Sequence, residues 1–380
     1  MKSLPDPPSL HGELIQSSRL RVGLTVLTTA ITIGVASAAS PIWLSHVSST
    51  SNSTFNYTVV ERPETKSRGE HLLQFSLMQR AGESAHPVGN TGIWHASNGW
   101  SIFYEKTSST MSSGLRFSAY MPGPQDDTFL HAHLNAEQPV FKQSILDHPS
   151  LNGNPNALLF VTHNWAASGV YNDQFSPVVY HTPTARWRLI GYIPGDEFTP
   201  IPENSNFNIL VRTPSNQAFV HTATAVNTTN DAAGYRTTLD HPTLNGNPMA
   251  QILVTNVWKP DSIGQTFSQM QSVYNTSLAR WQLDPVGNVD IPLNSEFHIF
   301  CAAAQNPRPP NLTIEKSGGS AELSFETEAD FIYRLEQSFS FSSWANDGAE
   351  VTGDGSAVQL LRPLRPGAEF YRIRYSIAAP

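Results

Sequence analysis

A ten-residue motif that occurs twice constrains the fold of this chain more than any other feature of its sequence. Residues 146–155 read Leu-Asp-His-Pro-Ser-Leu-Asn-Gly-Asn-Pro, and residues 239–248 repeat them with one change, Thr for Ser. The two copies are 93 residues apart. A spacing of this size indicates a repeated structural unit, so the chain must form the same small arrangement of elements more than once.

The correspondence continues beyond the motif. Trp165 and Trp258 follow the two copies at the same distance, and an Ala-Arg-Trp triplet that ends at Trp187 returns at Trp281. Trp100 stands where a third such Trp is expected, although this part of the chain lacks the motif. Terminal copies of a repeat are often atypical. We therefore predict three repeats: a degenerate one at 69–125 and two fuller ones at 126–213 and 214–304.

The repeats carry the sequence pattern of strands. Residues 158–162 and 251–255 are short apolar segments, while residues 186–190 alternate polar and apolar side chains, as half-buried strands do. Only 14% of the residues are charged, and there are 28 Pro and 24 Gly, a composition typical of turn-rich extracellular β proteins. We predict an all-β fold in which small β-sandwich or barrel repeats follow one another in a row.

The N-terminal residues indicate export. Arg19 and Arg21 precede an uncharged segment at 22–36, and the small residues Ala36-Ser37-Ala38 follow it. This order predicts a signal peptide at 1–38, cleaved after Ala38. The alternative is an uncleaved N-terminal anchor, which would be the protein's only association with a membrane. In either case the protein is expected outside the cell or at its surface.

Two further segments complete the predicted organisation. Residues 39–68 are rich in Ser, Thr and Asn and are interpreted as a linker. A Pro-rich boundary near residue 307 separates the repeats from the last part of the chain. Residues 305–380 contain several short apolar segments between Gly-rich turns and are expected to form a C-terminal β-sandwich.

The repeated motif has two possible roles. Carboxylate, imidazole and amide groups gathered in one turn can bind a ligand or Ca²⁺. Alternatively, the Asp and Asn side chains hold the loop together by bonding its own backbone, and the prolines fix its path. The candidate ligand-binding residues of the first loop are Asp147, His148, Asn152 and Asn154, and those of the second loop are Asp240, His241, Asn245 and Asn247.

The recurring tryptophans also have two interpretations. Exposed indole rings stack on sugars, so Trp165 and Trp258 are further candidates for ligand binding. The alternating strands that contain Trp100, Trp187 and Trp281 instead favour core positions for these three.

The remaining residue types predict neither a metal site nor a cofactor. Thirteen His residues are present, including His131 and His133 on one strand face, but no carboxylate or Cys recurs to complete a coordination shell. Cys301 is the only Cys, so an intrachain disulfide is impossible. We interpret it as a buried structural thiol rather than a reactive one.

Two parts of the chain resemble known families. The motif, followed by Val161-Thr162 and Trp165 and by their counterparts in the second copy, resembles an uncharacterised repeat domain of secreted bacterial proteins. The segment Tyr333-Arg334-Leu335-Glu336, with Trp344 and Phe370-Tyr371-Arg372-Ile373, resembles the fibronectin-type-III-like C-terminal modules of exported verrucomicrobial proteins. These resemblances imply a secreted β-rich protein and no particular activity.

Two functions remain open. The first is a secreted or surface-bound protein without catalytic activity, with a binding or structural role toward a glycan, a protein or the cell envelope. The second is an extracellular hydrolase of polysaccharides that uses carboxylates such as Asp196, Glu197 or Asp284. The sequence contains none of the catalytic motifs that we searched for. A polar loop that occurs more than once favours binding over catalysis, because active sites are usually single whereas binding gains from several copies. The net charge of −8 offers no basic patch for nucleic acid.

Overall fold

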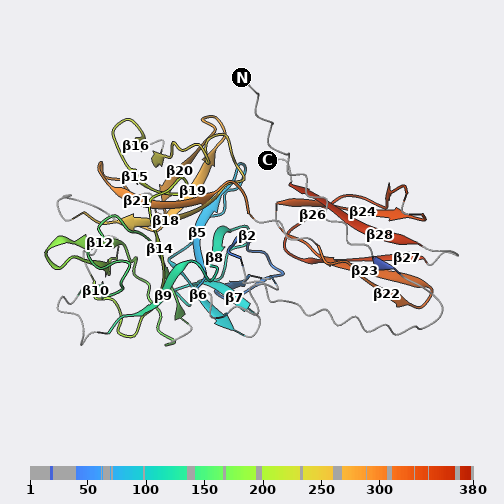
Figure 1. Ribbon diagram of the computed structural model, residues 1–380, viewed down its shortest axis with the longest axis horizontal. Helices are drawn as coiled ribbons and strands as arrows, with labels where there is room; N and C mark the ends of the chain where they lie inside the picture. The colour runs from blue at the N-terminus through green and yellow to red at the C-terminus, as the bar shows by residue number, and fades with distance from the viewer. Residues whose placement is uncertain are drawn as a thin grey trace, which may run out of the picture. The chain divides into compact units, whose positions relative to one another are not determined.

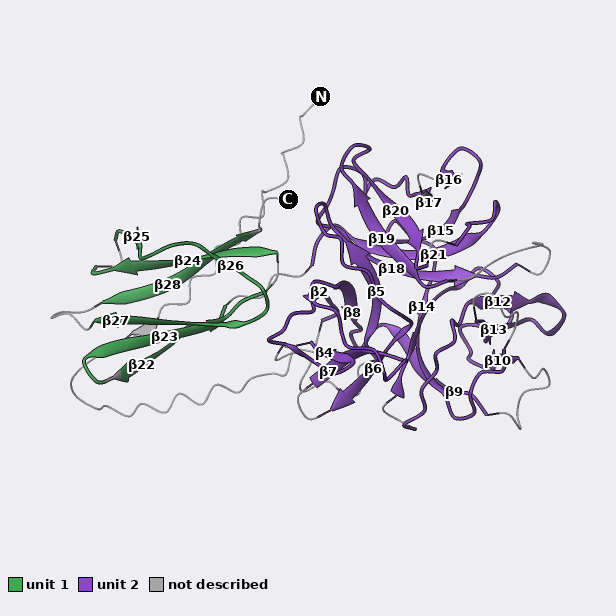
Figure 2. Cartoon of the chain, turned by 180° about the vertical axis from the view of Figure 1, so that it is seen from behind, with its two compact units in different colours: residues 1–31, 307–379 green, residues 32–306, 380 purple. Residues whose placement is uncertain are grey.

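The computed structural model describes residues 18–19, 40–60, 62, 69, 72–96, 99–134, 142–165, 168–193, 199–231, 234–259, 268–287, 289–305, 310–328, 330–340, 342–363 and 369–377. The chain divides into two compact units, Met1–Ile31 with Pro307–Ala379, and Thr32–Asn306 with Pro380 (Figure 2). The regular structure in the described ranges consists of strands and one short 3-10 helix, η3 (Thr182–Thr184), which confirms the all-β prediction. These ranges contain no helix with the length and hydropathy that a membrane span requires.

The larger unit contains one strand arrangement three times (Figure 1). Repeat 1 comprises β2 (Ile42–Val47), β3 (Ser53–Thr54), β4 (Tyr57–Val59), β5 (Gln74–Gln79), β6 (Thr91–Ala96), β7 (Gly99–Tyr104) and β8 (Arg116–Met121). Repeat 2 comprises β9 (Asp127–Ala132), β10 (Gln143–Leu146), β11 (Leu158–His163), β12 (Val178–His181), β13 (Arg186–Ile190) and β14 (Asn206–Arg212). Repeat 3 comprises β15 (Ala218–Thr222), β16 (Thr228–Asp231), β17 (Gly234–Thr238), β18 (Gln251–Val257), β19 (Met270–Asn275), β20 (Arg280–Pro285) and β21 (Glu296–Ala302).

The three repeats close into a ring. Each repeat forms a parallel contact with the next at equivalent positions: Ile93 with Asn164, Val178 with Val257, and Ser272 with Met78. Repeats 2 and 3 therefore share one six-stranded sheet, and repeats 3 and 1 share one of seven strands. Because each repeat completes a sheet of its neighbour, the repeats are parts of one pseudo-threefold unit and not separate modules in a row.

Repeat 1 begins earlier than its sequence suggests. Strands β2, β3 and β4 lie inside 39–68, and the interpretation of that segment as a linker is corrected here for residues 42–59. Strand β2 pairs along its length with β8, and Trp43 and Leu44 are buried. The Ser- and Thr-rich composition concealed these strands because hydroxyl side chains are compatible with strand pairing when they find partners. Thr58, for example, is fully buried and bonds the ring of His46.

The central strands β5, β11 and β18 meet at the pseudo-threefold axis through hydroxyl groups. One backbone N–H of each strand donates to a side-chain hydroxyl of another repeat: Phe75 to Thr162 at 3.4 Å, Val161 to Thr255 at 3.4 Å, and Val254 to Ser76 at 2.9 Å. We call Ser76, Thr162 and Thr255 the axial hydroxyl ring. Its hydroxyls accept hydrogen bonds from one buried and two partly buried backbone N–H groups, because backbone donors away from water need partners.

Each repeat also has its own apolar core, and a fourth cluster joins them. The fourth cluster includes Tyr120, Leu210 and Phe300, which are equivalent residues of β8, β14 and β21. Trp100, Trp187 and Trp281 are 1%, 2% and 0% exposed, which confirms their predicted core positions. Burial of such a side chain contributes about 1.5–3 kcal/mol, so these positions anchor each repeat.

A histidine recurs in the first strand of every repeat, buried in repeats 1 and 3 and half-buried in repeat 2. The Nε2 atoms of these rings bond a hydroxyl of β4, β10 and β17: His46 with Thr58, His131 with Ser144, and His221 with Thr237, at 2.7, 2.6 and 2.8 Å. Burial is the largest cause that lowers their pKa values, to about 3, 4 and 4. These histidines are neutral structural groups at pH 7.

The smaller unit contains the remaining strands in two sheets. Its strands are β1 (Ser18–Arg19), β22 (Thr313–Ser317), β23 (Ser320–Glu326), β24 (Phe331–Ser338), β25 (Ala345–Asn346), β26 (Val351–Thr352), β27 (Ala357–Pro363) and β28 (Phe370–Ile377). Leu323, Tyr333 and Tyr371 are buried between the sheets. Apart from β1, the segment predicted to be a signal peptide or anchor lies outside the described residues.

Candidate ligand-binding site

The two copies of the repeated motif form the same loop, and its polar groups bond one another. The Asn152 amide donates to the Asp147 carboxylate at 2.7 Å, and Asn245 donates to Asp240 at 2.7 Å in the other copy. The conformation requires glycine at Gly153, whose φ of +72° lies in the left-handed region. The Asp–Asn pair therefore braces the loop from within.

The remaining residues of the motif also contact the repeat that carries them. His148 stacks on Phe129 with ring centroids 4.2 Å apart, and His241 stacks on Phe219 at 4.3 Å. The backbone oxygen of Asn154 accepts the indole N–H of Trp187, as that of Asn247 does from Trp281. These contacts favour the structural alternative for the motif, and ligand binding by its eight residues stays a prediction.

The contribution of the loops to stability can be tested directly. We expect the double variant Asn152→Ala/Asn245→Ala to lose about 1–3 kcal/mol in free energy of unfolding. The first change removes the bond to Asp147, and the second removes the bond to Asp240 and the one that Asn245 accepts from the His241 N–H. Asn156→Ala, at an exposed position next to the first loop, is the control and should change stability by less than about 0.5 kcal/mol. Denaturant unfolding of the full chain measures both. Wild-type stability in the double variant would contradict the bracing role.

The loops and the candidate tryptophans do not form one site. The first loop enters β11 at Leu158, whereas Trp165 follows the other end of that strand at His163. Six strand residues at about 3.3 Å each separate the two ends by nearly 20 Å. Trp258 has the same relation to the second loop at β18. A small ligand stacked on either tryptophan would therefore not contact the loop of the same repeat.

Trp165 belongs to a surface cluster of five aromatic residues. Its ring lies 6.4 Å from that of Trp94 and 5.9 Å from that of Tyr171. Tyr57 packs edge-on against Trp94 at 4.7 Å, and Phe103 lies beneath both Trp94 and Tyr171. Phe103 is buried, Tyr171 is 42% exposed, and the other three are half-buried. We call these residues the aromatic platform.

The aromatic platform occurs at one of the three junctions between repeats. Strand registers place Tyr57, Trp94, Phe103 and Trp165 at positions that recur at the other junctions. At the junction of repeats 2 and 3 the equivalents are Gln143, Val179, Ile190 and Trp258. At the junction of repeats 3 and 1 they are Arg236, Val273, Asp284 and Gln79. The scaffold is symmetric, but this surface is not.

A buried glutamate–histidine pair lies beside the platform. Glu105 and His163 are 4% and 8% exposed, and the His163 ring contacts the Glu105 carboxylate. Burial raises the pKa of Glu105, and its contacts with His163 and the Asn172 backbone oppose that rise. The Asn172 N–H donates to Glu105 at 2.9 Å, which fixes the segment that presents Tyr171. Glu105 and His163 are therefore positioning residues for the platform.

A family model described as a domain of unknown function, DUF7452, matches residues 92–192 and again residues 177–301. Together the two matches cover more than half of the 380 residues. The chain belongs to this family. Both matches begin at equivalent points of the DUF7452 repeat, at the start of β6 and just before β12. No curated protein and no solved structure matches the chain.

The family match supports the expected likeness to an uncharacterised repeat domain, and the DUF7452 description names no activity. Among the described residues, no group of three or more His, Cys, Asp or Glu side chains is arranged to hold a metal ion. Cys301 is fully buried, and burial raises the pKa of its thiol to about 12. This agrees with the structural interpretation of that residue.

Asp284, one of the carboxylates considered for hydrolysis, does not lie at the platform. Asp196 and Glu197 lie outside the described residues. Asp284 is paired with Arg236 at 3.4 Å, and its pKa is raised to about 6, chiefly by burial. It occupies the position that Phe103 has in repeat 1, at a different junction.

Sequence reasoning found Trp165 but missed the rest of the platform. Trp94, Tyr57 and Tyr171 each stand alone in the sequence, and no motif marks Glu105 or His163. The platform could have been found by comparing equivalent positions of the three repeats. Repeat 1 has Trp94 where repeats 2 and 3 have Val179 and Val273. That comparison needs the strand register, which only the structure supplied.

Proposed function

We propose that this protein is an exported, non-catalytic glycan-binding protein whose ligand stacks on the aromatic platform. The main support for this proposal is that solvent-accessible aromatic rings are concentrated at one of the three junctions of a symmetric scaffold. Sugar rings bury their C–H faces against such side chains, while their hydroxyls remain in water. A functional site is usually singular, and this surface breaks the symmetry that the rest of the unit keeps.

Two features of the neighbourhood support the same proposal. The buried Glu105–His163 pair costs desolvation energy that an apolar core would avoid, and such perturbed pairs gather at functional sites. The acidic net charge does not favour nucleic acid or anionic membranes as ligands. The proposed location is extracellular or at the cell surface, with export through the N-terminal segment and a fibronectin-type-III-like C-terminal module.

The chain contains a matched pair of tryptophans for the test. Trp165 and Trp258 are half-buried and occupy equivalent positions of repeats 2 and 3, but only Trp165 contacts other platform rings. We expect Trp165→Ala to weaken glycan binding about tenfold or more, because a stacked ring contributes about 1.5–3 kcal/mol. Trp258→Ala is expected to bind as the wild type does. Glycan arrays and pull-down on cellulose, chitin and xylan supply the measurements.

Three outcomes would count against this proposal. Equal losses in Trp165→Ala and Trp258→Ala would indicate a repeated site rather than a single platform. Release of reducing sugar by the wild type, abolished in Asp284→Asn, would establish the hydrolase alternative. Failure of the folded wild type to bind any glycan on the array would remove glycans as the ligand class.

A further inference from the structure

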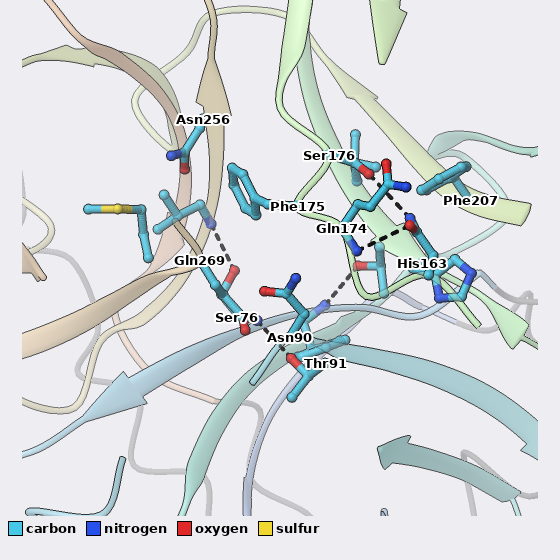
Figure 3. Close-up of a pocket in the computed structure, with 16 residues that line it drawn as sticks. Ser76, Asn90, Thr91, His163, Gln174, Phe175, Ser176, Phe207, Asn256 and Gln269 are labelled. Atoms are coloured by element: carbon cyan, nitrogen blue, oxygen red, sulfur yellow. Dashed lines mark hydrogen bonds between the residues drawn. The ribbon is translucent and has the colours of Figure 1, made fainter. Parts of the chain in front are cut away.

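A partly open cavity of about 90 Å³ lies where the three repeats meet. Ser76 and Thr162 of the axial hydroxyl ring line it, and Figure 3 shows Ser76 among the other lining residues. Repeat 1 also contributes Asn90 and Thr91, and repeat 3 contributes Asn256 and Gln269. The contribution of repeat 2 includes Asn172, Gln174, Phe175 and Ser176. The cavity therefore exists only in the closed ring, and none of its lining residues belongs to the repeated motif.

The chemistry of the lining selects an uncharged ligand. Its described residues include no Lys, Arg, Asp or Glu, and His163 is the one titratable side chain among them. Phosphates and carboxylates are bound by Arg or Lys, and metal ions by carboxylates. Amide and hydroxyl groups instead alternate here with the apolar faces of Phe75, Phe175 and Phe207. A ligand with both hydroxyl groups and C–H faces fits such a wall.

The cavity also has unused hydrogen-bonding capacity. The Gln269 amide donates to the Thr91 hydroxyl at 2.7 Å, while its Oε1 atom is buried and has no partner among the described residues. The Nε2 atom of His163 is likewise buried without a partner there. Both are able to accept a hydrogen bond when His163 donates from Nδ1 to Glu105. One water needs about 10–15 Å³ by this measure of volume, so the space holds several waters or one small polyhydroxylated molecule.

We infer that this axial cavity is a second binding site, which takes one uncharged polyhydroxylated unit: a single sugar residue or a linear polyol. It differs from the aromatic platform in ligand size and in the residues that would bind it. The unit is either a free small molecule or the terminal residue of a glycan. Hydroxyl donors of the ligand replace cavity water at Gln269 Oε1, and its C–H face packs on the phenylalanine rings.

The test is calorimetric titration of the full-length protein with glucose, galactose, mannose, N-acetylglucosamine and sorbitol. A second arm uses oligosaccharides that end in the same sugars, and binding in that arm alone would assign the cavity to chain ends. We expect saturable binding with at least one probe, weakened tenfold or more by Gln269→Met. Asn256→Leu, which introduces the residue that repeat 1 has at the equivalent Leu77, should have the same effect.

Trp165→Ala is the control, because it removes a platform ring and leaves the cavity lining unchanged. It should retain wild-type affinity for the small probes, so failure of the platform proposal and failure of this one are distinguishable. The inference is overturned if no probe binds in either arm. It is also overturned if folded Gln269→Met and Asn256→Leu proteins, verified by circular dichroism, bind every probe as the wild type does.

Discussion

Lowering the pH from 7 to 5 is expected to remove about 6 kcal/mol from the free energy of unfolding of the larger unit, a loss as large as the whole stability of a marginally stable domain. The cause is a set of buried or half-buried neutral histidines, His46, His131, His221 and His298, whose pKa values are lowered to between about 3 and 4, mainly by burial. The unfolded chain protonates the same side chains near pH 6.5. Acid therefore favours the unfolded state.

The sign and the pH window follow from these values. Folding lowers the pKa of such a His, so above pH 6.5 the side chain is neutral in both the folded and the unfolded state and stability is unaffected. Between pH 6.5 and the folded pKa the unfolded state binds a proton that the folded state does not, and the free energy of unfolding falls as the pH drops. Each of the four loses about 2 kcal/mol at pH 5. Asp284 and Glu105 have raised pKa values and act in the opposite direction, regaining stability as the pH falls. Their smaller contribution reduces the expected net loss.

One variant isolates the histidine contribution. His221→Gln keeps a hydrogen-bonding group for Thr237 but binds no proton, so its stability should fall less steeply between pH 6 and pH 5, by about 1.4 kcal/mol per pH unit. Leu239→Ala, a buried apolar truncation in the same repeat, is the control: it should lower stability by about 2–5 kcal/mol at every pH without changing the slope. Seven of the eight Trp lie in the larger unit, so Trp fluorescence follows its unfolding in urea. An unchanged slope in His221→Gln would contradict the assignment.

Removing the axial hydroxyl ring is expected to cost about 2–4 kcal/mol, because the triple variant Ser76→Ala/Thr162→Val/Thr255→Val leaves three backbone N–H groups, one buried and two partly buried, without their acceptors. Two of the three bonds are long, at 3.4 Å, so each contributes toward the lower end of the usual range. Thr162 also donates to Gln74 at 2.8 Å, and that bond is lost as well. The axis is a place where all three repeats contact one another.

The control for this variant is Thr162→Ser/Thr255→Ser, which retains every axial hydroxyl and loses only two methyl groups. We expect it to retain most of the stability that the triple variant loses, when both are measured by urea unfolding at pH 7. A triple variant as stable as the serine control would show that the axial hydroxyls do not hold the repeats together. The two units are compact separately, so the transition of the smaller unit should not change.

Much of the architecture was readable from the sequence because repetition imposes the same local pattern several times. The spacing of Trp100, Trp187 and Trp281 identified three equivalent core positions. The first strands of repeat 1 were missed because Ser- and Thr-rich segments resemble linkers until their partners are known. Strand β2 is recognisable only beside β8, more than 60 residues later.

The sequence by itself determined the repeat, the β class and the identity of the core tryptophans, since each depends on local pattern and periodicity. Only the tertiary structure decided that the repeats share sheets in a closed ring, because that depends on strand pairing between residues such as Met78 and Ser272. Ring closure also created both candidate sites. It gathers the platform rings at one junction and forms the axial cavity from three repeats, and neither arrangement can be read from residues that are distant in the chain.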